Sequence, residues 1–169
     1  MVREAVFSIL GGLWETRFED RTLLDLFAGS GVMAVEAVGR GLATATCVEK
    51  SRPVFAALRK NLDALGLADQ VTCRNTDAGH FLRSETTAEY DLIYMDPPYA
   101  MTELRDAVLL EAGARCRLTP DGVLLLEQDV RHNPPPTAGC LTQFMTRRWG
   151  QTQVSFYHVP ENSRLPRII

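Results

Sequence analysis

The chain has 169 residues, of which 46% are hydrophobic and 23% charged, a composition typical of a folded globular protein with a full core. The formal net charge is −3, so overall charge does not indicate a nucleic-acid-binding protein. Arg3 and Glu4 interrupt the apolar run at the start, and no apolar stretch is long enough to span a bilayer. We therefore expect one domain over residues 1–169, without a signal peptide or a membrane span.

Helical and strand-like patterns alternate along the chain. Helices are predicted over residues 2–14, 31–40, 53–65 and 103–116. Strands are predicted over residues 22–28, 44–48, 71–75, 91–95 and 123–127, and the last two, 144–148 and 153–159, form a hairpin across Gly150. Pro120-Asp121-Gly122 is predicted to be a turn, and residues 132–139 a loop.

This alternation predicts an α/β fold: a doubly wound, Rossmann-like, seven-stranded sheet, mostly parallel, with an antiparallel C-terminal hairpin. Such sheets bind ligands at the carboxyl ends of their strands. The first four predicted strands each carry a carboxylate at or after that end, namely Asp25, Glu49, Asp77 and Asp96. We therefore expect these four side chains to converge on one edge of the sheet.

The stretch from Asp25 to Gly31 predicts a strand, a tight glycine turn and the start of a helix. Phe27, Ala28 and Ser30 lie within it, and Gly29 and Gly31 permit a sharp turn and a close approach of a ligand to the backbone. The following helix directs N–H groups at the space over the turn, which suits carboxylate or sugar oxygens. The alternative is a turn with a purely structural role.

Glu49 lies about 20 residues after the glycine turn, the spacing at which an acidic residue accepts hydrogen bonds from ribose hydroxyls. The alternative is a solvated carboxylate near Lys50 or Arg52. Asp77, before Ala78, could accept a hydrogen bond from an adenine amino group or could cap a helix, and the two interpretations are compatible.

Asp96-Pro97-Pro98-Tyr99 is the sharpest motif in the sequence. The two prolines lack N–H donors and hold the backbone extended, so that the Pro97 carbonyl can point outward. A carboxylate and a carbonyl can accept hydrogen bonds from an amino group on a flat ring, and Tyr99 can stack on that ring. The alternative is a proline turn after a strand.

The four cysteines are far apart in sequence and form no C-x-x-C pair; they are Cys47, Cys73, Cys116 and Cys140. We predict four reduced thiols, as is usual in cytosolic proteins. The three histidines have no spacing, with the cysteines or with one another, that is typical of a metal site, so no metal is expected.

The glycine turn and the Asp96 motif together resemble the S-adenosylmethionine-dependent amino methyltransferases. The resemblance is closer to the bacterial 16S ribosomal RNA guanine-N2 methyltransferases of RsmD type, since residues 2–7, Gly39-Arg40-Gly41 and residues 148–152 also match. It implies that S-adenosylmethionine lies over residues 25–31, with Glu49, Lys50, Asp77, Ala78 and Asp96 around it, and that S-adenosylhomocysteine is the product. It implies that Asp96, Pro97, Pro98 and Tyr99 hold the target amine.

The resemblance further implies a monomeric cytoplasmic enzyme that acts on ribosomal RNA or the assembling small subunit. The family usually carries a basic segment before the stretch that begins at Val2, and here Met1 stands there. Some RNA-binding charge would then be missing, although arginines at the rim could touch phosphate: Arg3, Arg40, Arg147 and Arg148. Three rivals stay open: an adenine-N6 or other amine methyltransferase, a non-catalytic donor- or RNA-binding subunit and, more distantly, a nicotinamide dehydrogenase.

Overall fold

The computed structural model describes residues 2–84, 88–98, 101–161, 163 and 165. Within these residues, five helices and eight strands follow one another largely in the predicted order. The elements are α1 (Val2–Leu13), β1 (Thr22–Asp25), α2 (Val32–Gly39), β2 (Thr44–Val48), α3 (Arg52–Ala64), β3 (Val71–Arg74), α4 (Ala78–Ser84), β4 (Tyr90–Met95), α5 (Thr102–Arg115), β5 (Leu118–Asp129), β6 (Thr137–Ala138), β7 (Leu141–Trp149) and β8 (Thr152–His158).

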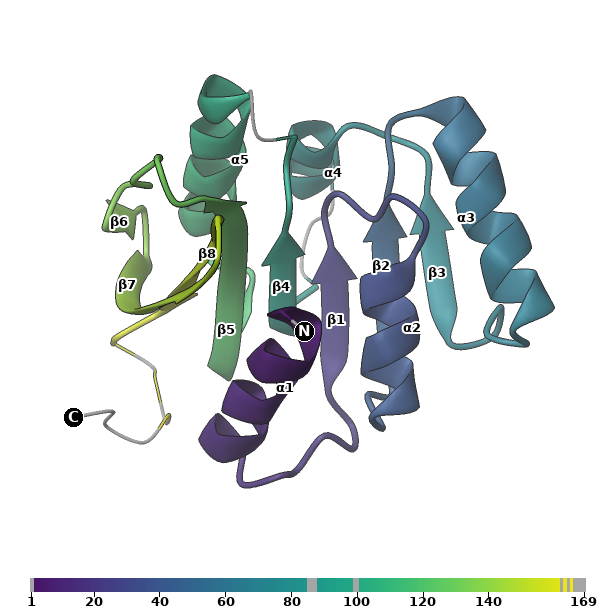
Figure 1. Cartoon of the computed structure of the whole chain (residues 1–169), viewed down its shortest axis with the longest axis horizontal. Helices are drawn as coiled ribbons and strands as arrows, with labels where there is room; N and C mark the ends of the chain where they lie inside the picture. The colour runs from purple at the N-terminus through teal and green to yellow at the C-terminus, as the bar shows by residue number, and fades with distance from the viewer. Residues whose placement is uncertain (1, 85–87, 99–100, 162, 164, 166–169) are drawn as a thin grey trace.

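All eight strands form one sheet in the order β3-β2-β1-β4-β5-β8-β7-β6 (Figure 1). Strands β1 to β5 pair in parallel, whereas β8 is antiparallel to both β5 and β7. The prediction of a mostly parallel sheet with an antiparallel C-terminal hairpin is confirmed. The sheet has one strand more than predicted, because β6 pairs with β7 inside the stretch that we expected to be a loop.

Helices cover both faces of the sheet, and each face has its own apolar core. Helices α1, α2 and α3 lie on the near face in Figure 1 and pack on residues such as Leu23, Leu92 and Leu125. Helices α4 and α5 pack on the opposite face, against residues such as Leu24 and Leu124. No helix in the described part of the chain is both long and apolar enough to cross a membrane.

Three elements differ from the sequence prediction. Strand β1 ends at Asp25, although Leu26 and Ala28 still donate backbone hydrogen bonds to the neighbouring strands, because the chain then bends into the glycine turn. Helix α4 was not predicted, since its seven residues are too few to show a clear period. The Pro120-Asp121-Gly122 stretch lies inside β5, as an irregularity in its pairing with β4.

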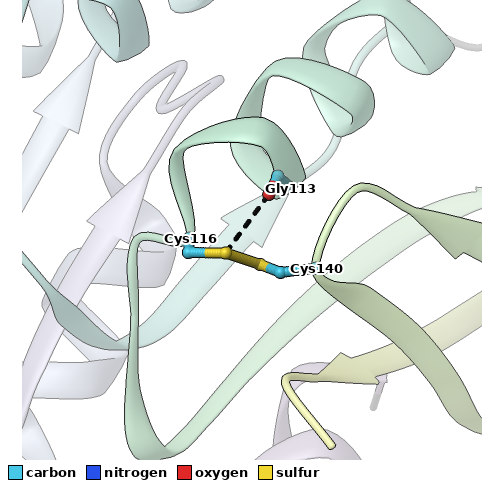
Figure 2. The surroundings of a disulfide bond; sticks show 3 residues. All are labelled: Gly113, Cys116 and Cys140. Atoms are coloured by element: carbon cyan, nitrogen blue, oxygen red, sulfur yellow. Dashed lines mark hydrogen bonds between the residues drawn. A yellow bond between two sulfur atoms is a disulfide. The ribbon is translucent and has the colours of Figure 1, made fainter. Parts of the chain in front are cut away.

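The end of α5 packs very closely against the turn between β6 and β7. A Cβ atom added to Gly113 would lie within 1.7 Å of the Ala138 carbonyl oxygen, so only glycine fits there. The Gly113 oxygen accepts a hydrogen bond from the Cys140 amide at 3.1 Å. Figure 2 shows a disulfide between Cys116 and Cys140 at this junction, with Cα atoms 6.0 Å apart.

The prediction of four reduced thiols is therefore wrong for Cys116 and Cys140. The two cysteines are 24 positions apart, with β5 and β6 between them, and only the packing of α5 against the β6–β7 turn brings their side chains together. Cys47 and Cys73 are free thiols, the first buried and the second half-buried in neighbouring strands.

Candidate active site

The turn between β1 and α2 requires glycine for two reasons at Gly31. Its φ of 86° lies in the left-handed region that favours glycine. A Cβ atom at this position would also lie 2.5 Å from Cδ1 of Leu58 on α3. Gly29 has a φ of 53°, which is also in the left-handed region that favours glycine.

The Glu49 carboxylate, after β2, ties the glycine turn to its neighbours. It accepts hydrogen bonds from the amide of Gly29 at 3.1 Å and from the amide of Ser51 at 2.7 Å. Asn75, after β3, donates to the carbonyl oxygens of Glu49 and Lys50 at 2.8 and 3.2 Å. Each carboxylate oxygen of Glu49 retains a lone pair for a further donor, so these contacts leave it able to accept hydroxyl groups of a ligand.

Asp77 caps α4, because its carboxylate accepts a hydrogen bond from the amide of His80 at 3.2 Å. The Lys50 ammonium lies 3.6 Å from the same carboxylate and is largely exposed. This pair therefore lies at the rim of the site, and the capping interpretation of Asp77 is confirmed.

Two adjoining cavities open at the carboxyl ends of the strands and share the side chains of Phe27 and Asp96. The larger cavity, of about 480 Å³, is lined by Leu26, Phe27, Val48, Glu49, Lys50, Ser51, Thr76, Asp77, Ala78, Asp96, Pro98, Met101 and Leu104. The turn cavity, of about 230 Å³, is lined by Arg3, Asp25, Phe27, Ala28, Gly29, Ser30, Val32, Met33, Tyr94 and Asp96. The expected convergence of four strand-end carboxylates is therefore confirmed.

Asp25 is buried and Asp96 is half-buried where the two cavities adjoin. Asp25 is 1% exposed, and burial raises its pKa to about 7 despite a hydrogen bond from the Phe27 amide at 3.2 Å. Burial also raises the pKa of Asp96 to about 7, with a further contribution from the charge of Glu127. Near neutral pH each carboxylate can therefore gain or lose a proton.

Two residues of the site were missed by the sequence analysis. Tyr94 lies two residues before Asp96 and shares its cavity, and its hydroxyl donates a 2.5 Å hydrogen bond to the Glu127 carboxylate. Glu127 lies near the carboxyl end of β5. The rule that found the other carboxylates, one at the end of each parallel strand, also applies to Glu127 and could have found it.

The remaining predicted residues differ in where they lie. Gly31 is not among the residues that line either cavity. Pro97 is buried and lines a third, small cavity with Glu127, and Pro98 lines both this cavity and the larger one. Tyr99 lies outside the described residues, so its stacking role stays a prediction.

The arginines that we predicted at the rim differ in what they contact. Arg3, at the start of α1, lines the turn cavity. Arg40 pairs with Glu36 at 2.6 Å, and Arg148 donates to Gln153 at 2.8 Å, so both are engaged within the protein. Among the described residues, no group of three or more histidine, cysteine, aspartate or glutamate side chains could hold a metal ion.

The C-terminal stretch 148–152 also reaches the edge of the site. Asp129, the last residue of β5, pairs with Thr152 of β8, which in turn pairs with Trp149 of β7. The turn of this hairpin therefore lies beside the carboxyl end of β5, next to the strand that supplies Glu127.

Comparison with known proteins shows the family. Residues 1–158 match the family model described as "Conserved hypothetical protein 95". The chain belongs to this family. A relative from Bacillus subtilis, named "Putative rRNA methyltransferase YlbH", is 30% identical over 92% of this chain and 83% of its own length. The resemblance to the RsmD-type methyltransferases is thereby confirmed.

Two further comparisons agree with it. "Ribosomal RNA small subunit methyltransferase D" of Escherichia coli is 33% identical over 79% of this chain. The chain spans 64% of that relative's length. A solved structure of a conserved hypothetical protein from Streptococcus pyogenes is 30% identical, covers 92% of this chain and 93% of its own, and superposes with a TM-score of 0.79.

Proposed function

We propose that this protein transfers a methyl group from S-adenosylmethionine to the exocyclic N2 amino group of a guanine in 16S ribosomal RNA. The observation that carries the proposal is the junction at Asp96. There the end of β4 faces both the cavity over the glycine turn and the larger cavity beside Glu49. The names of the ribosomal RNA relatives support the substrate class, and a ribosomal RNA substrate implies the cytoplasm.

The residues of the two cavities fit the donor. The larger cavity combines apolar walls, which suit an adenine ring, with the Glu49 carboxylate, which can accept ribose hydroxyls. In this proposal, Asp77 and Ala78 border the adenine, Lys50 lies at the rim, and residues 25–31 hold the methionine part. When bound, S-adenosylmethionine supplies an electrophilic methyl group on a positively charged sulfur.

The protein's contribution is to position and partly desolvate the amine. Asp96 and the Pro97 carbonyl accept hydrogen bonds from the amino group and thereby orient the nitrogen lone pair toward the methyl group. Tyr99 is proposed, from the sequence, to stack on the ring. A guanine within an RNA helix must leave its stack for its amino group to reach Asp96.

Mass mapping of nucleosides tests the proposal most directly. The purified protein is incubated with S-adenosylmethionine and either free 16S RNA or small subunits from a strain that lacks the activity. We expect N2-methylguanosine at one position. N6-methyladenosine would instead support the adenine rival, and donor binding without methylation of any RNA would support a non-catalytic subunit.

A further inference from the structure

Four oxygen-bearing side chains project from one face of three adjacent strands, at the end where the cavities open. Asp25 comes from β1, Tyr94 and Asp96 from β4 and the end of that strand, and Glu127 from β5. Side chains along a strand alternate between the two faces of the sheet. Tyr94 belongs to the same apolar core as Leu125, and Glu127 lies two residues after Leu125 and therefore on the same face. Glu127 is therefore directed toward the same space as Asp96.

Tyr94 fixes the position of Glu127. The tyrosine ring is 6% exposed, and its hydroxyl donates the 2.5 Å hydrogen bond to Oε2 of Glu127. Burial and then the neighbouring carboxylates, Asp96 first, raise the pKa of Tyr94, so the hydroxyl keeps its proton at all working pH values. A donor that cannot ionise stabilises the charged form of the carboxylate that it contacts.

Among the residues that the structure describes, few positively charged side chains lie beside these four groups, and Lys50 is one, since it lines the larger cavity with Asp96. Arg3 of α1 lines the turn cavity with Asp25 and Asp96. Arg105 of α5 lies near Glu127 but donates to Asp106 at 2.7 Å and to Gln128 at 3.0 Å.

Two more groups face Glu127 from the C-terminal side of the sheet. His132, in the loop after β5, lines the small cavity that contains Glu127. Arg147 of β7 pairs with Val154, the residue that pairs with Glu127, so it lies two strands away on the same face. Glu127 therefore accepts its hydrogen bond from the neutral Tyr94 hydroxyl and not from a cation.

We propose that Glu127, held by the Tyr94 hydroxyl, is a positioning residue that makes Asp96 the proton acceptor of the methyl transfer. This inference rests on the proposed function. The amine nitrogen forms a bond to the methyl carbon, the sulfur keeps the electron pair of the broken S–C bond, and the nitrogen then loses one proton to a carboxylate oxygen of Asp96. The pKa of Asp96, about 7, suits a base that must be ionised before the reaction and protonated after it.

The test compares Glu127→Gln with two controls. Asp129→Asn removes an equal charge two residues further along the same strand. The Asp129 carboxylate pairs with the exposed side chain of Arg131. Glu127→Asp keeps the charge. The dependence of kcat on pH is measured for the parent and for all three variants. In parallel, the Asp96 carboxyl is titrated by carbon-13 NMR in the protein without donor or RNA, with Asp96→Asn used for the assignment.

Removing the charge of Glu127 should lower the pKa of Asp96 and make it a weaker base. In Glu127→Gln we expect the acid limb of the kcat profile to move down by about one pH unit and the plateau to fall about tenfold. The NMR titration should move in the same direction. Asp129→Asn should match the parent, and Glu127→Asp should largely restore it.

An unmoved Asp96 titration in folded Glu127→Gln, or equal shifts in Glu127→Gln and Asp129→Asn, would overturn the inference. Failure of the proposed function looks different. In that case the parent protein methylates no 16S RNA, while the NMR titration still decides whether Glu127 acts on Asp96.

Discussion

The carboxyl edge of β1, β4 and β5 and the junction of α5 with the β6–β7 turn are held together by opposite means. At the edge, the buried carboxylate of Asp25 and the half-buried carboxylate of Asp96 line one cavity, and both have raised pKa values. At the junction, two backbones meet at Gly113 and Gly139 without intervening side chains, and a disulfide links the same segments.

This difference indicates that the edge serves the reaction and that the junction serves the stability of the fold. Burying a charge without a counter-charge costs free energy. The fold tolerates this cost at the edge, where the raised pKa values of the carboxylates suit proton transfer near neutral pH. Close packing and a covalent link stabilise the folded chain but offer no titrating group. Changes at the edge should therefore alter activity first, and changes at the junction should alter stability first.

The largest effect should come from Asp96→Ala. We expect methyl transfer to fall on the order of 10²–10³-fold, because a positioned acceptor is lost at the reacting amine. Donor affinity should stay within a few-fold, since Glu49 and the glycine turn remain. Single-turnover methylation with saturating donor, together with calorimetry of donor binding, measures both quantities. An Asp96→Ala protein with full activity would disprove the proposed mechanism.

The second effect tests the junction. Replacing Cys116 and Cys140 by serine should lower the free energy of unfolding by about 3 kcal/mol, given the 24-residue separation of the linked positions. Denaturant unfolding measures this loss, and addition of a reductant to the parent protein should reproduce it. Methyl transfer by the folded double variant should equal that of the parent. A serine variant that is as stable as the oxidised parent would show that the link contributes nothing.

The third effect concerns pH and stability at the edge. The pKa of Asp25 is raised in the folded protein from its ordinary value of 3.8 to about 7, so protonation favours the folded state. The stability that this contributes is present below about pH 4 and is lost as the pH rises through 7. Asp25→Asn should therefore unfold less readily above pH 8, by on the order of 2 kcal/mol.

Asp96 has the same window, so Asp25→Asn should only partly flatten the pH dependence of stability. Urea unfolding at pH 5 and pH 8 for the parent and the variant gives the difference in slope. An identical slope in both proteins would contradict the assignment of a raised pKa to Asp25.

The smallest effect belongs to Glu49→Ala, which should weaken binding of S-adenosylmethionine by roughly tenfold. Its carboxylate bonds both to the glycine turn and to Ser51, so part of the loss would reflect a looser turn. Glu49→Gln keeps one acceptor oxygen and should retain more affinity than Glu49→Ala. Calorimetry with unchanged affinity in folded Glu49→Ala would remove this residue from the donor site.

The positions of the site residues could be predicted from the topology of parallel sheets. Strands that alternate with helices pair in parallel, and their carboxyl ends meet at one edge. The sequence alone therefore indicated that Asp25, Glu49, Asp77 and Asp96 lie together. Gly29 and Gly31 were recognisable because a turn with positive φ strongly favours glycine. These features depend on residues close together in sequence.

The alternation of helices and strands, the glycine turn and the four carboxylates could be predicted from the amino-acid sequence, because they depend on local burial and backbone conformation. The contact of Tyr94 with Glu127, 33 residues away, and that of Cys116 with Cys140 could not be predicted in this way. Both contacts depend on which strands are neighbours and on how α5 packs against the β6–β7 turn. That packing is settled by the whole chain at once, and local pattern does not report it.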